Sequence, residues 1–348
     1  MTKILKTGIV GYGYAAKTFH APLIKAVSGL QLAAISSSNP AKVHIDQPDL
    51  AVFSSPEELF SCADIDLVVI PTPNDTHFPL AAAALAAGKH VVLDKPFTLT
   101  TSEGKELIKL AHQYDRLLSV FHNRRWDSDF LTLKKVLREG SLGRVTHFES
   151  HFDRYRPEVQ TRWRESAALG GGLWFDLGSH LLDQALQLFG TPKTIWLDLA
   201  QQRDGAVADD WFHAVLGYDE KRVILHGSAL VANPGPRMTV HGTSGSFTKF
   251  GLDTQENALK SGQQPGTPGW GNDPLSCKLS LKHKDAIIDQ YIITTPGNYQ
   301  AYYEGIRDAI CLGSPNPVMA EQALLVMRLI GLGIDSAEEG RKLRVFDL

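Results

Sequence analysis

The sequence predicts an α/β protein: an N-terminal Rossmann-type doubly wound parallel sheet, followed by an α+β domain. Three observations support this prediction. A glycine-rich turn follows the first apolar strand, short apolar runs alternate with helical segments over the first third, and strands then follow one another with few helices between them. With 348 residues, 43% of them hydrophobic, the chain is long enough for two domains with separate cores.

The first third contains short apolar runs of the kind that form buried parallel strands. They are Ile4–Val10, Leu30–Ile35, Leu67–Ile70, Val91–Leu93 and Leu117–Phe121. Helix boundaries lie between them: Ser55 and Pro56 are a cap and a first helical residue, and Gly88 ends the alanine-rich segment 80–87. We therefore predict an N-terminal domain over residues 1–122.

The pattern changes after Phe121, where most of the later runs are typical of strands. Helices are expected over 127–139, 174–189 and 320–339. Strands are expected over 144–152, 194–199, 211–216, 223–230, 238–240 and 287–293, and an irregular loop over 262–274. Strands in succession favour a mostly antiparallel sheet, so residues 123–348 are expected to form an α+β domain.

Composition argues against several classes of function. The net charge is only −3 and the basic residues are scattered, which indicates neither a nucleic-acid nor a membrane partner. No apolar run approaches the roughly 18 residues of a membrane span, and the start has no leader pattern, so a cytoplasmic protein is expected. Cys62, Cys277 and Cys311 lie far apart, and no Cys and His set has zinc spacing, so no metal is predicted.

The turn after the first strand has the spacing of a dinucleotide-binding motif. It reads Gly11, Tyr12, Gly13, Tyr14, Ala15 and Ala16. The glycines allow the backbone to approach a pyrophosphate, the helix N-terminus supplies free N–H groups, and Ala16 permits close helix packing. A purely structural turn would look similar, but the position between a strand and a helix favours nucleotide binding.

The end of the second strand bears on the choice of cofactor. An NAD site normally places a carboxylate there for the adenosine ribose, whereas this chain has Ser36, Ser37 and Ser38, then Lys42. Hydroxyl groups and a lysine suit a 2′-phosphate, so NADP is predicted over NAD. A simple polar turn and dual cofactor use remain alternatives.

Polar residues follow the next strands at the same carboxyl edge, where ligands bind in such sheets. After Ile70 the candidates for cofactor contacts are Pro71, Thr72, Asn74 and His77, although each can equally serve a turn or a cap. After Leu93 come Asp94 and Lys95, and a lysine at this edge can stabilise a substrate oxygen beside a nicotinamide.

Asp176 and His180 form a second candidate group. They are four residues apart in a predicted helix, which places a carboxylate and an imidazole on one face. A structural pair on the helix surface is the alternative. The preceding triple glycine, 170–172, favours a close backbone approach to a ligand or to the other domain.

These motifs resemble those of the Gfo/Idh/MocA oxidoreductase family over nearly the whole chain. The most specific parts are Asp94-Lys95-Pro96, where the family has Glu-Lys-Pro, and the glycine run through Asp176 and His180. The serine triplet and the segment 122–127 resemble the NADP-dependent scyllo-inositol dehydrogenase subgroup. The resemblance implies a large open sheet in the C-terminal domain, through which homodimers or homotetramers pack, and a catalytic set of Lys95, Asp176 and His180.

The resemblance leads to a hypothesis of hydride transfer between NADP and a secondary alcohol of a cyclic polyol or sugar. His180 is expected to move the hydroxyl proton, Lys95 to stabilise the alkoxide, and Asp176 to orient the imidazole and bind substrate. Further candidates for the substrate pocket are Asn123, Arg124, Trp163 and Arg164, and Asp94, Asn123, Trp163 and Arg164 are also candidates for cofactor contacts. A core tryptophan and surface arginines are the alternative. Reduction of another carbonyl compound and a regulatory NADP-binding role without turnover are the alternatives.

Overall fold

The structure is a computed structural model that describes residues 4–346, apart from the side chain of Trp163. The chain divides into two compact units. The first holds the residues up to Asn123 together with Gln255–Trp270 and Asn298–Leu324. The second holds Arg124–Thr254, Gly271–Gly297 and the chain from Leu325 onward. A boundary near His122 is expected from the sequence; the structure additionally assigns two later segments to the first unit.

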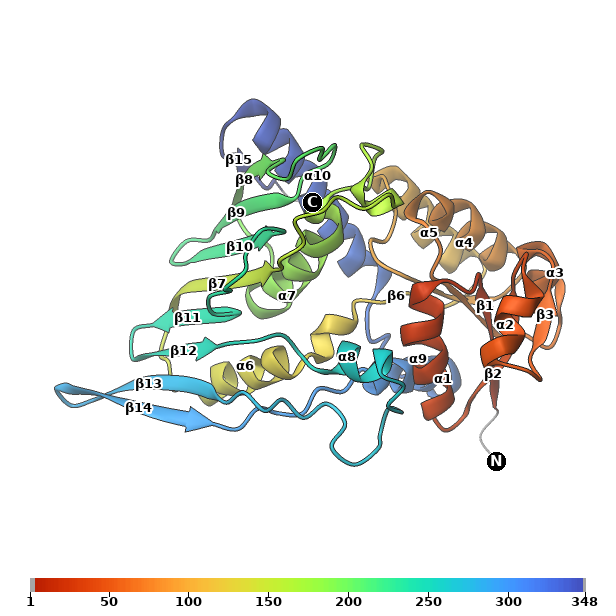
Figure 1. The fold of residues 1–348 in the computed structure, drawn as a ribbon, viewed down its shortest axis with the longest axis horizontal. Coiled ribbons are helices and arrows are strands. Elements are labelled where there is room, and N and C mark those ends of the chain that lie inside the picture. The colour runs from red at the N-terminus through yellow and green to blue at the C-terminus, as the bar shows by residue number, and fades with distance from the viewer. Residues whose placement is uncertain (1–3, 347–348) are drawn as a thin grey trace. The chain divides into compact units, whose positions relative to one another are not determined.

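The first unit is built on a six-stranded parallel sheet with the order β3-β2-β1-β4-β5-β6 (Figure 1). Its strands are β1 (Leu5–Val10), β2 (Leu30–Ser36), β3 (Ala51–Phe53), β4 (Leu67–Ile70), β5 (His90–Leu93) and β6 (Leu118–Val120). The order reverses between β1 and β4, as in a doubly wound fold, so ligand-binding loops are expected at the carboxyl ends of these strands.

Three helices of this unit, α2 (Pro40–Asp46), α3 (Pro56–Ser61) and α5 (Thr101–Gln113), begin at residues whose side chains cap them. Further helices of the unit are η1 (Ala16–His20), α1 (Ala21–Ala26), η2 (Asn74–Thr76), α4 (His77–Ala86), α8 (Gln255–Lys260) and α9 (Gln300–Leu312). Ser55 caps α3 through the amide of Glu58, as its sequence predicts, and Thr100 and Glu103 form a capping box at α5. The doubly wound fold is confirmed.

The second unit contains a nine-stranded mixed sheet with the order β14-β13-β12-β11-β7-β10-β9-β8-β15. Its strands are β7 (Val145–Asp153), β8 (Thr194–Ala200), β9 (Trp211–Gly217), β10 (Arg222–Ser228), β11 (Met238–Gly242), β12 (Gly245–Lys249), β13 (Cys277–His283), β14 (Ala286–Ile292) and β15 (Leu343–Arg344). Strands β7 and β10 run parallel and the other paired strands run antiparallel, which confirms the mostly antiparallel sheet.

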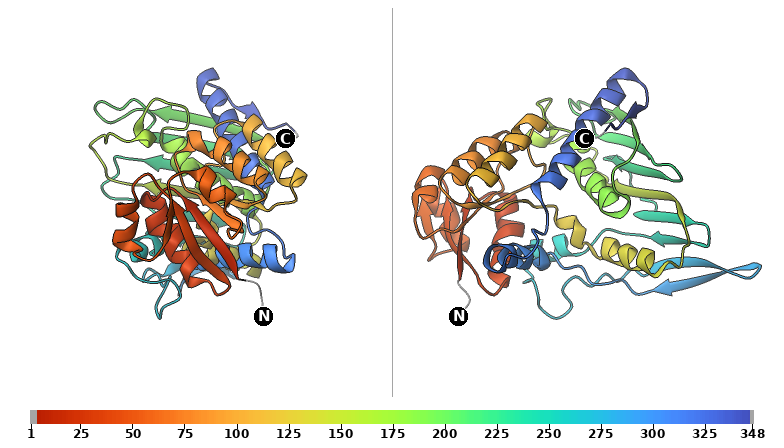
Figure 2. Two further views of the ribbon diagram at one scale, coloured as in Figure 1. Left: turned by 90° about the vertical axis from the view of Figure 1, so that its right-hand side faces the viewer. Right: turned by 180° about the vertical axis from the view of Figure 1, so that it is seen from behind.

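Helices cover one face of this sheet (Figures 1 and 2). They include α6 (Ser128–Glu139), η5 (Trp174–Gly178), α7 (Ser179–Phe189) and the later part of α10 (Ala320–Glu339). The chain also forms two short helical turns, η3 (Asn123–Trp126) and η4 (Trp163–Glu165). Along β7 the inward side chains Phe148 and Phe152 are fully buried, and Phe148 packs on Phe189 of α7. The intervening residues lie on the opposite face, which carries no helix of the described residues; we call it the helix-free face.

The helices and strands differ from the expected ones in a few places. Helix α10 has the expected bounds, whereas β3, β12, β13, β15, α8 and α9 were not expected. Strand β12 reads Gly-Ser-Phe-Thr-Lys and β13 carries two lysines and a histidine, so neither shows a continuous apolar run. In residues 4–346, no helix is both long enough and apolar enough to cross a membrane.

Candidate functional site

The glycine turn joins β1 to a helix whose first turn is of the π type, η1. Gly11 has a φ of 80°, and its amide donates to the carbonyl of Ser36 on the neighbouring strand at 2.7 Å. This conformation favours glycine. Ala16 is fully buried, which agrees with the close helix packing expected at that position.

Gly13 gives a separate argument for a bound nucleotide. A Cβ built at Gly13 would meet no atom within 4 Å, and its φ is not in the left-handed region, so the fold itself does not require glycine there. A pyrophosphate lying against the backbone would require it. The residues of this turn therefore fit a dinucleotide, with free N–H groups at a helix start.

The edge of β2 lacks a carboxylate for a ribose. Ser36 is buried, and the hydroxyl oxygen of Ser37 accepts a hydrogen bond from the amide of Asn39 at 3.1 Å. Ser38 and Lys42 are exposed. The next acid along the chain, Asp46, pairs with Lys17 at 2.7 Å and accepts a hydrogen bond from Tyr12 at 3.3 Å. The exposed Ser38 and Lys42 are available to an anionic ligand at this edge.

His77 lies beneath the loops that follow β4 and β5. Its side chain is fully buried. Its Nδ1 lies 3.0 Å from the carbonyl oxygen of Pro96, and its Nε2 lies 3.1 Å from that of Thr72. Burial lowers the pKa of His77, although Asp94 and the carbonyl oxygens act in the opposite direction. These contacts tie the two loops together, so the side chain of His77 has a clear structural task.

Asp94 and Lys95 directly follow β5. Asp94 accepts the amide of Lys95 at 2.7 Å and lies 3.7 Å from Nε2 of His20, whose Nδ1 is 2.6 Å from the hydroxyl oxygen of Tyr303. Burial by itself would raise the pKa of Asp94, but the His20 interaction and the charge of Lys95 lower it. An ionised, anchored carboxylate therefore holds the backbone from which the half-buried Lys95 side chain extends.

Asp176 and His180 lie on one continuous helical segment of the second unit. Asp176 belongs to the π-type turn η5, and His180 to the first turn of α7. Such π turns are frequent at functional sites. The side chain of Asp176 is 20% exposed, with its Oδ1 at 3.4 Å from Nε of Arg164, and His180 is 5% exposed. The structure thus brings the predicted carboxylate and imidazole onto one segment, whereas Lys95 belongs to the other unit.

Comparisons with known proteins agree with this arrangement. The NAD-binding Rossmann-fold model of the Gfo/Idh/MocA oxidoreductase family matches residues 5–122, and the model of its C-terminal α/β domain matches residues 134–345. The chain belongs to the Gfo/Idh/MocA oxidoreductase family. It is therefore an oxidoreductase with an NAD(P)-binding fold, as the motifs indicated.

Relatives and solved structures cover nearly the whole chain. The uncharacterized oxidoreductase YdgJ of Escherichia coli is 55% identical over 97% of this chain and 98% of its own. The NADP+-dependent scyllo-inositol 2-dehydrogenase IolW of Bacillus subtilis is 40% identical over 97% of this chain and 95% of its own. A Yersinia pestis oxidoreductase structure matches with a TM-score of 0.97 at 55% identity, covering 100% of this chain and 99% of that one.

Gly172, the last residue of the glycine run in this Gfo/Idh/MocA chain, packs against a carboxylate that sequence reasoning missed. Gly172 has a φ of 90°, and a Cβ there would overlap the carboxylate of Asp209. Asp209 accepts the amide of Trp174 at 2.7 Å at the start of the helical segment that carries Asp176. Burial raises the pKa of Asp209 to about 6. An acid 33 residues beyond Asp176 has no local sequence signal.

A pocket of the second unit includes Asp176 and is rich in arginine. Its arginines are Arg154, Arg156, Arg162, Arg164 and Arg203. The carboxylates that line it are Glu165, Asp176 and Asp209, so positive side chains outnumber negative ones. Arg203 is held by Glu165 at 3.1 Å and by Asp210 at 2.9 Å. Of the predicted pocket residues, Arg164 lies here, and the side chain of Trp163 lies outside the described part.

The segment after β6 contains the remaining candidates. Asn123 is buried and closes the first stretch of the first unit. Arg124 is buried over the ring of Phe152 at 4.7 Å and pairs with Asp127 at 3.3 Å. Arg125 donates twice to Asp183, at 2.8 and 2.6 Å. This bidentate pair gives Asp183, one helical turn beyond His180, a structural partner.

Proposed function

We propose that this protein transfers hydride between NADP(H) and a secondary alcohol or ketone of a cyclic polyol or sugar, with scyllo-inositol as the first candidate. The observation that carries the proposal is the placement of Asp176 and His180 on one helical segment of a chain that also has Lys95 at the carboxyl edge of its parallel sheet. The relative named for NADP-dependent scyllo-inositol oxidation, at 40% identity, supports the substrate class.

The proposed mechanism assigns one task to each side chain. The glycine turn 11–16 and the edge of β2 would hold the cofactor, whose nicotinamide would supply the hydride acceptor for the carbinol carbon of the substrate. His180 takes the hydroxyl proton and becomes an imidazolium; the loss of this proton together with the hydride converts the alcohol to a ketone. Lys95 stabilises the negative charge that develops on the substrate oxygen. Asp176 orients the imidazole and binds a neighbouring hydroxyl group, and reduction of a ketone reverses each step.

NADP is proposed over NAD because the edge of β2 offers hydroxyl groups and a lysine where a ribose-binding carboxylate would stand. Asp46 is an unsuitable substitute because Lys17 and Tyr12 already engage it. Ser38 and Lys42 are the exposed groups that would contact a 2′-phosphate.

The arginine-rich pocket favours a second candidate substrate. Arg156 and Arg164 line the same pocket as Asp176, and guanidinium groups bind carboxylates and phosphates in a bidentate manner. An acidic derivative of a sugar or polyol would match this excess of positive charge better than a neutral inositol does. Its carbonyl or hydroxyl group would react through the same three side chains.

We also propose that a second copy of the chain packs on the helix-free face, giving a homodimer or homotetramer. Trp196, Trp211, Val215 and Ile224 are half-buried residues of this face on three adjacent strands. Apolar side chains on an uncovered sheet face are typical of a protein interface. No macromolecular partner other than a second copy is proposed.

The testing experiment measures initial rates with NADP+ and NAD+ against inositols, aldoses and acidic sugars, for the wild type and two variants. We expect Lys95→Ala and His180→Ala each to lower turnover by about 10² to 10⁴, because each removes a positioned acid, base or electrostatic group. NADPH binding, followed by its fluorescence, should be largely retained. Lys109→Ala and His283→Ala replace exposed residues and serve as matched controls.

Normal turnover in both variants would overturn the catalytic assignment. Tight NADPH binding without turnover on any polyol or ketone would favour the regulatory alternative. Preference for an acidic sugar over scyllo-inositol would select the second substrate class and leave the mechanism unchanged.

A further inference from the structure

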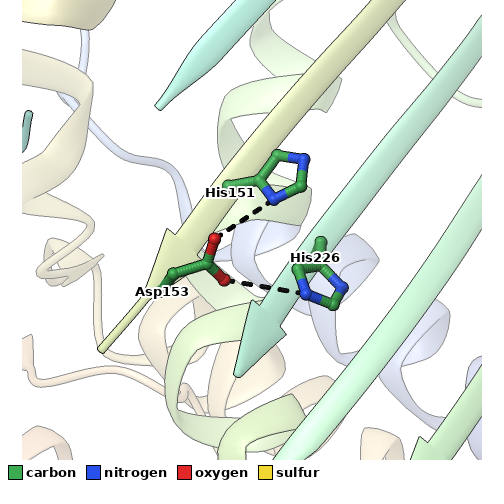
Figure 3. Close-up of side chains that lie close together, drawn as sticks. All are labelled: His151, Asp153 and His226. Carbon is green, nitrogen blue, oxygen red and sulfur yellow. Dashed lines mark hydrogen bonds and ion pairs between the residues drawn. The ribbon is translucent and has the colours of Figure 1, made fainter. Parts of the chain in front are cut away.

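Two histidines and an aspartate that have no part in the proposed catalysis gather on the helix-free face of the nine-stranded sheet. They are His151 and Asp153 of β7 and His226 of β10 (Figure 3). One ligand atom from each lies within 4.8 Å of the other two. Nδ1 of His151 is 3.3 Å from Oδ2 of Asp153, and Nε2 of His226 is 3.7 Å from Oδ1 of Asp153.

The strand register explains why these side chains meet. In the parallel pair β7 and β10, His226 lies opposite His151. Asp153 is two residues beyond His151, so it projects from the same face of the sheet. Residues 75 positions apart in sequence are thereby brought together by two rigid strands rather than by loops. This explains why the cluster has no local spacing motif in the sequence.

Asp153 is placed as a ligand rather than as a solvated surface acid. Its side chain is only 7% exposed, and its Oδ1 is buried without a hydrogen-bond partner. Buried polar atoms are nearly always hydrogen-bonded, and an exception calls for an explanation such as an ion. This oxygen points toward the ring of His226 in the centre of the group (Figure 3).

His151 also has the contact that a metal-binding histidine usually makes. With Nδ1 directed at Asp153, its Nε2 lies 2.8 Å from Oε1 of Glu149. A carboxylate on the far ring nitrogen fixes the orientation of a ligating imidazole and strengthens it as a donor. Glu149 is in turn 3.4 Å from His147, so it has a second hydrogen-bond partner.

Two of the separations between ligand atoms are close to those of a tetrahedral zinc site, and all three atoms lie within 4.8 Å of one another. Ligands about 2.0 to 2.1 Å from a zinc ion lie roughly 3.3 Å from one another in a tetrahedral site. His151 and His226 face different oxygens of Asp153, Oδ2 at 3.3 Å and Oδ1 at 3.7 Å, and both separations are close to this value. Two imidazoles and one carboxylate suit zinc and similar transition metals rather than magnesium or calcium, which prefer oxygen ligands.

We propose that His151, Asp153 and His226 bind one divalent transition-metal ion per chain, with Zn²⁺ and Co²⁺ as suitable ions. The ion cross-links β7 and β10 and leaves at least one coordination position for water or another ligand. A further histidine, His213, lies directly opposite His226 on β9, with its ring centroid 5.5 Å from that of His226. This site is independent of the proposed hydride transfer.

The test uses full-length protein without a histidine tag, freed of metal by chelation and dialysis. Zn²⁺ binding is measured by calorimetry and Co²⁺ binding by visible absorption. We expect one saturable site per chain, and a rise in the thermal unfolding midpoint when Zn²⁺ is added. His226→Gln and Asp153→Asn should each weaken Zn²⁺ affinity at least tenfold and abolish that rise. His283→Gln, at the exposed end of β13 in the same sheet, is the matched control.

Circular dichroism of the metal-free variants checks that they are folded. Should either buried variant fail to fold, His151→Gln replaces the more exposed of the two histidines, whose side chain is 27% accessible. The proposal is overturned if the wild type shows no saturable binding in the micromolar range. It is equally overturned if folded variants bind Zn²⁺ as tightly as the wild type does.

Discussion

Among individual residues, the buried carboxyl group of Asp209 makes the stability of the fold depend on pH. Burial raises its pKa to about 6, with a further contribution from Asp210, while the amide of Trp174 acts in the opposite direction. An unfolded aspartate titrates near 3.9. The folded state therefore holds this proton more tightly, and the stability from Asp209 is present below about pH 4 and is lost as the pH rises to about 6.

We predict that Asp209→Asn removes this loss, because an amide does not ionise and still accepts the Trp174 amide proton. Urea unfolding at pH 4 and pH 7 measures the effect. The free energy of unfolding of the variant minus that of the wild type should be more positive at pH 7 than at pH 4. Asp204→Asn changes an exposed acid of the same loop and is the control. Equal pH dependence in Asp209→Asn and the wild type would contradict the prediction.

At the level of elements, the π turn η5 depends on close packing between Gly178 and Trp174. A Cβ at Gly178 would overlap the indole ring of Trp174, which is 1% exposed and donates to the carbonyl of Ile330 at 3.1 Å. The ring cannot move away, because Gly333 of α10 also lies against it. The turn between Asp176 and His180 is therefore held by glycine on both sides of a buried tryptophan.

Gly178→Ala is expected to lower the free energy of unfolding by about 1 to 3 kcal/mol through overpacking. It should also reduce turnover, because His180 lies only two residues beyond Gly178 and would be displaced with the backbone. Chemical denaturation and initial rates measure the two effects. Gly331→Ala is the control: a Cβ there meets nothing within 4 Å, so the substitution should stabilise α10 by up to about 1 kcal/mol. Similar losses in both variants would argue against the packing explanation.

At the level of the whole molecule, the helix-free face makes a prediction about assembly. We expect light scattering to show a dimer or tetramer in the wild type. Val215→Glu combined with Ile224→Glu should shift the assembly toward smaller species, because two negative charges would be buried in the interface without opposite charges beside them. Ile45→Glu, at a residue that is 80% exposed in the first unit, is the control. A wild type that is monomeric at micromolar concentration would contradict the assembly proposal.

The sequence by itself determined the doubly wound sheet, most strands of the second unit and the helical segment of Asp176 and His180. It could do so because buried strands, glycine turns and helix caps are local patterns of adjacent residues. It placed Lys95 and Asp94 at the end of a strand for the same reason.

Only the tertiary structure decided the contacts between distant residues. They include the contacts of His20 with Tyr303 and Asp94, and the packing of Asp209 against Gly172. The cluster of His151, Asp153 and His226 is a third example. Each depends on strand register or on packing of segments far apart in the chain. The polar strands β12 and β13 were missed for a related reason: their pairing partners, rather than an apolar pattern of their own, make them strands.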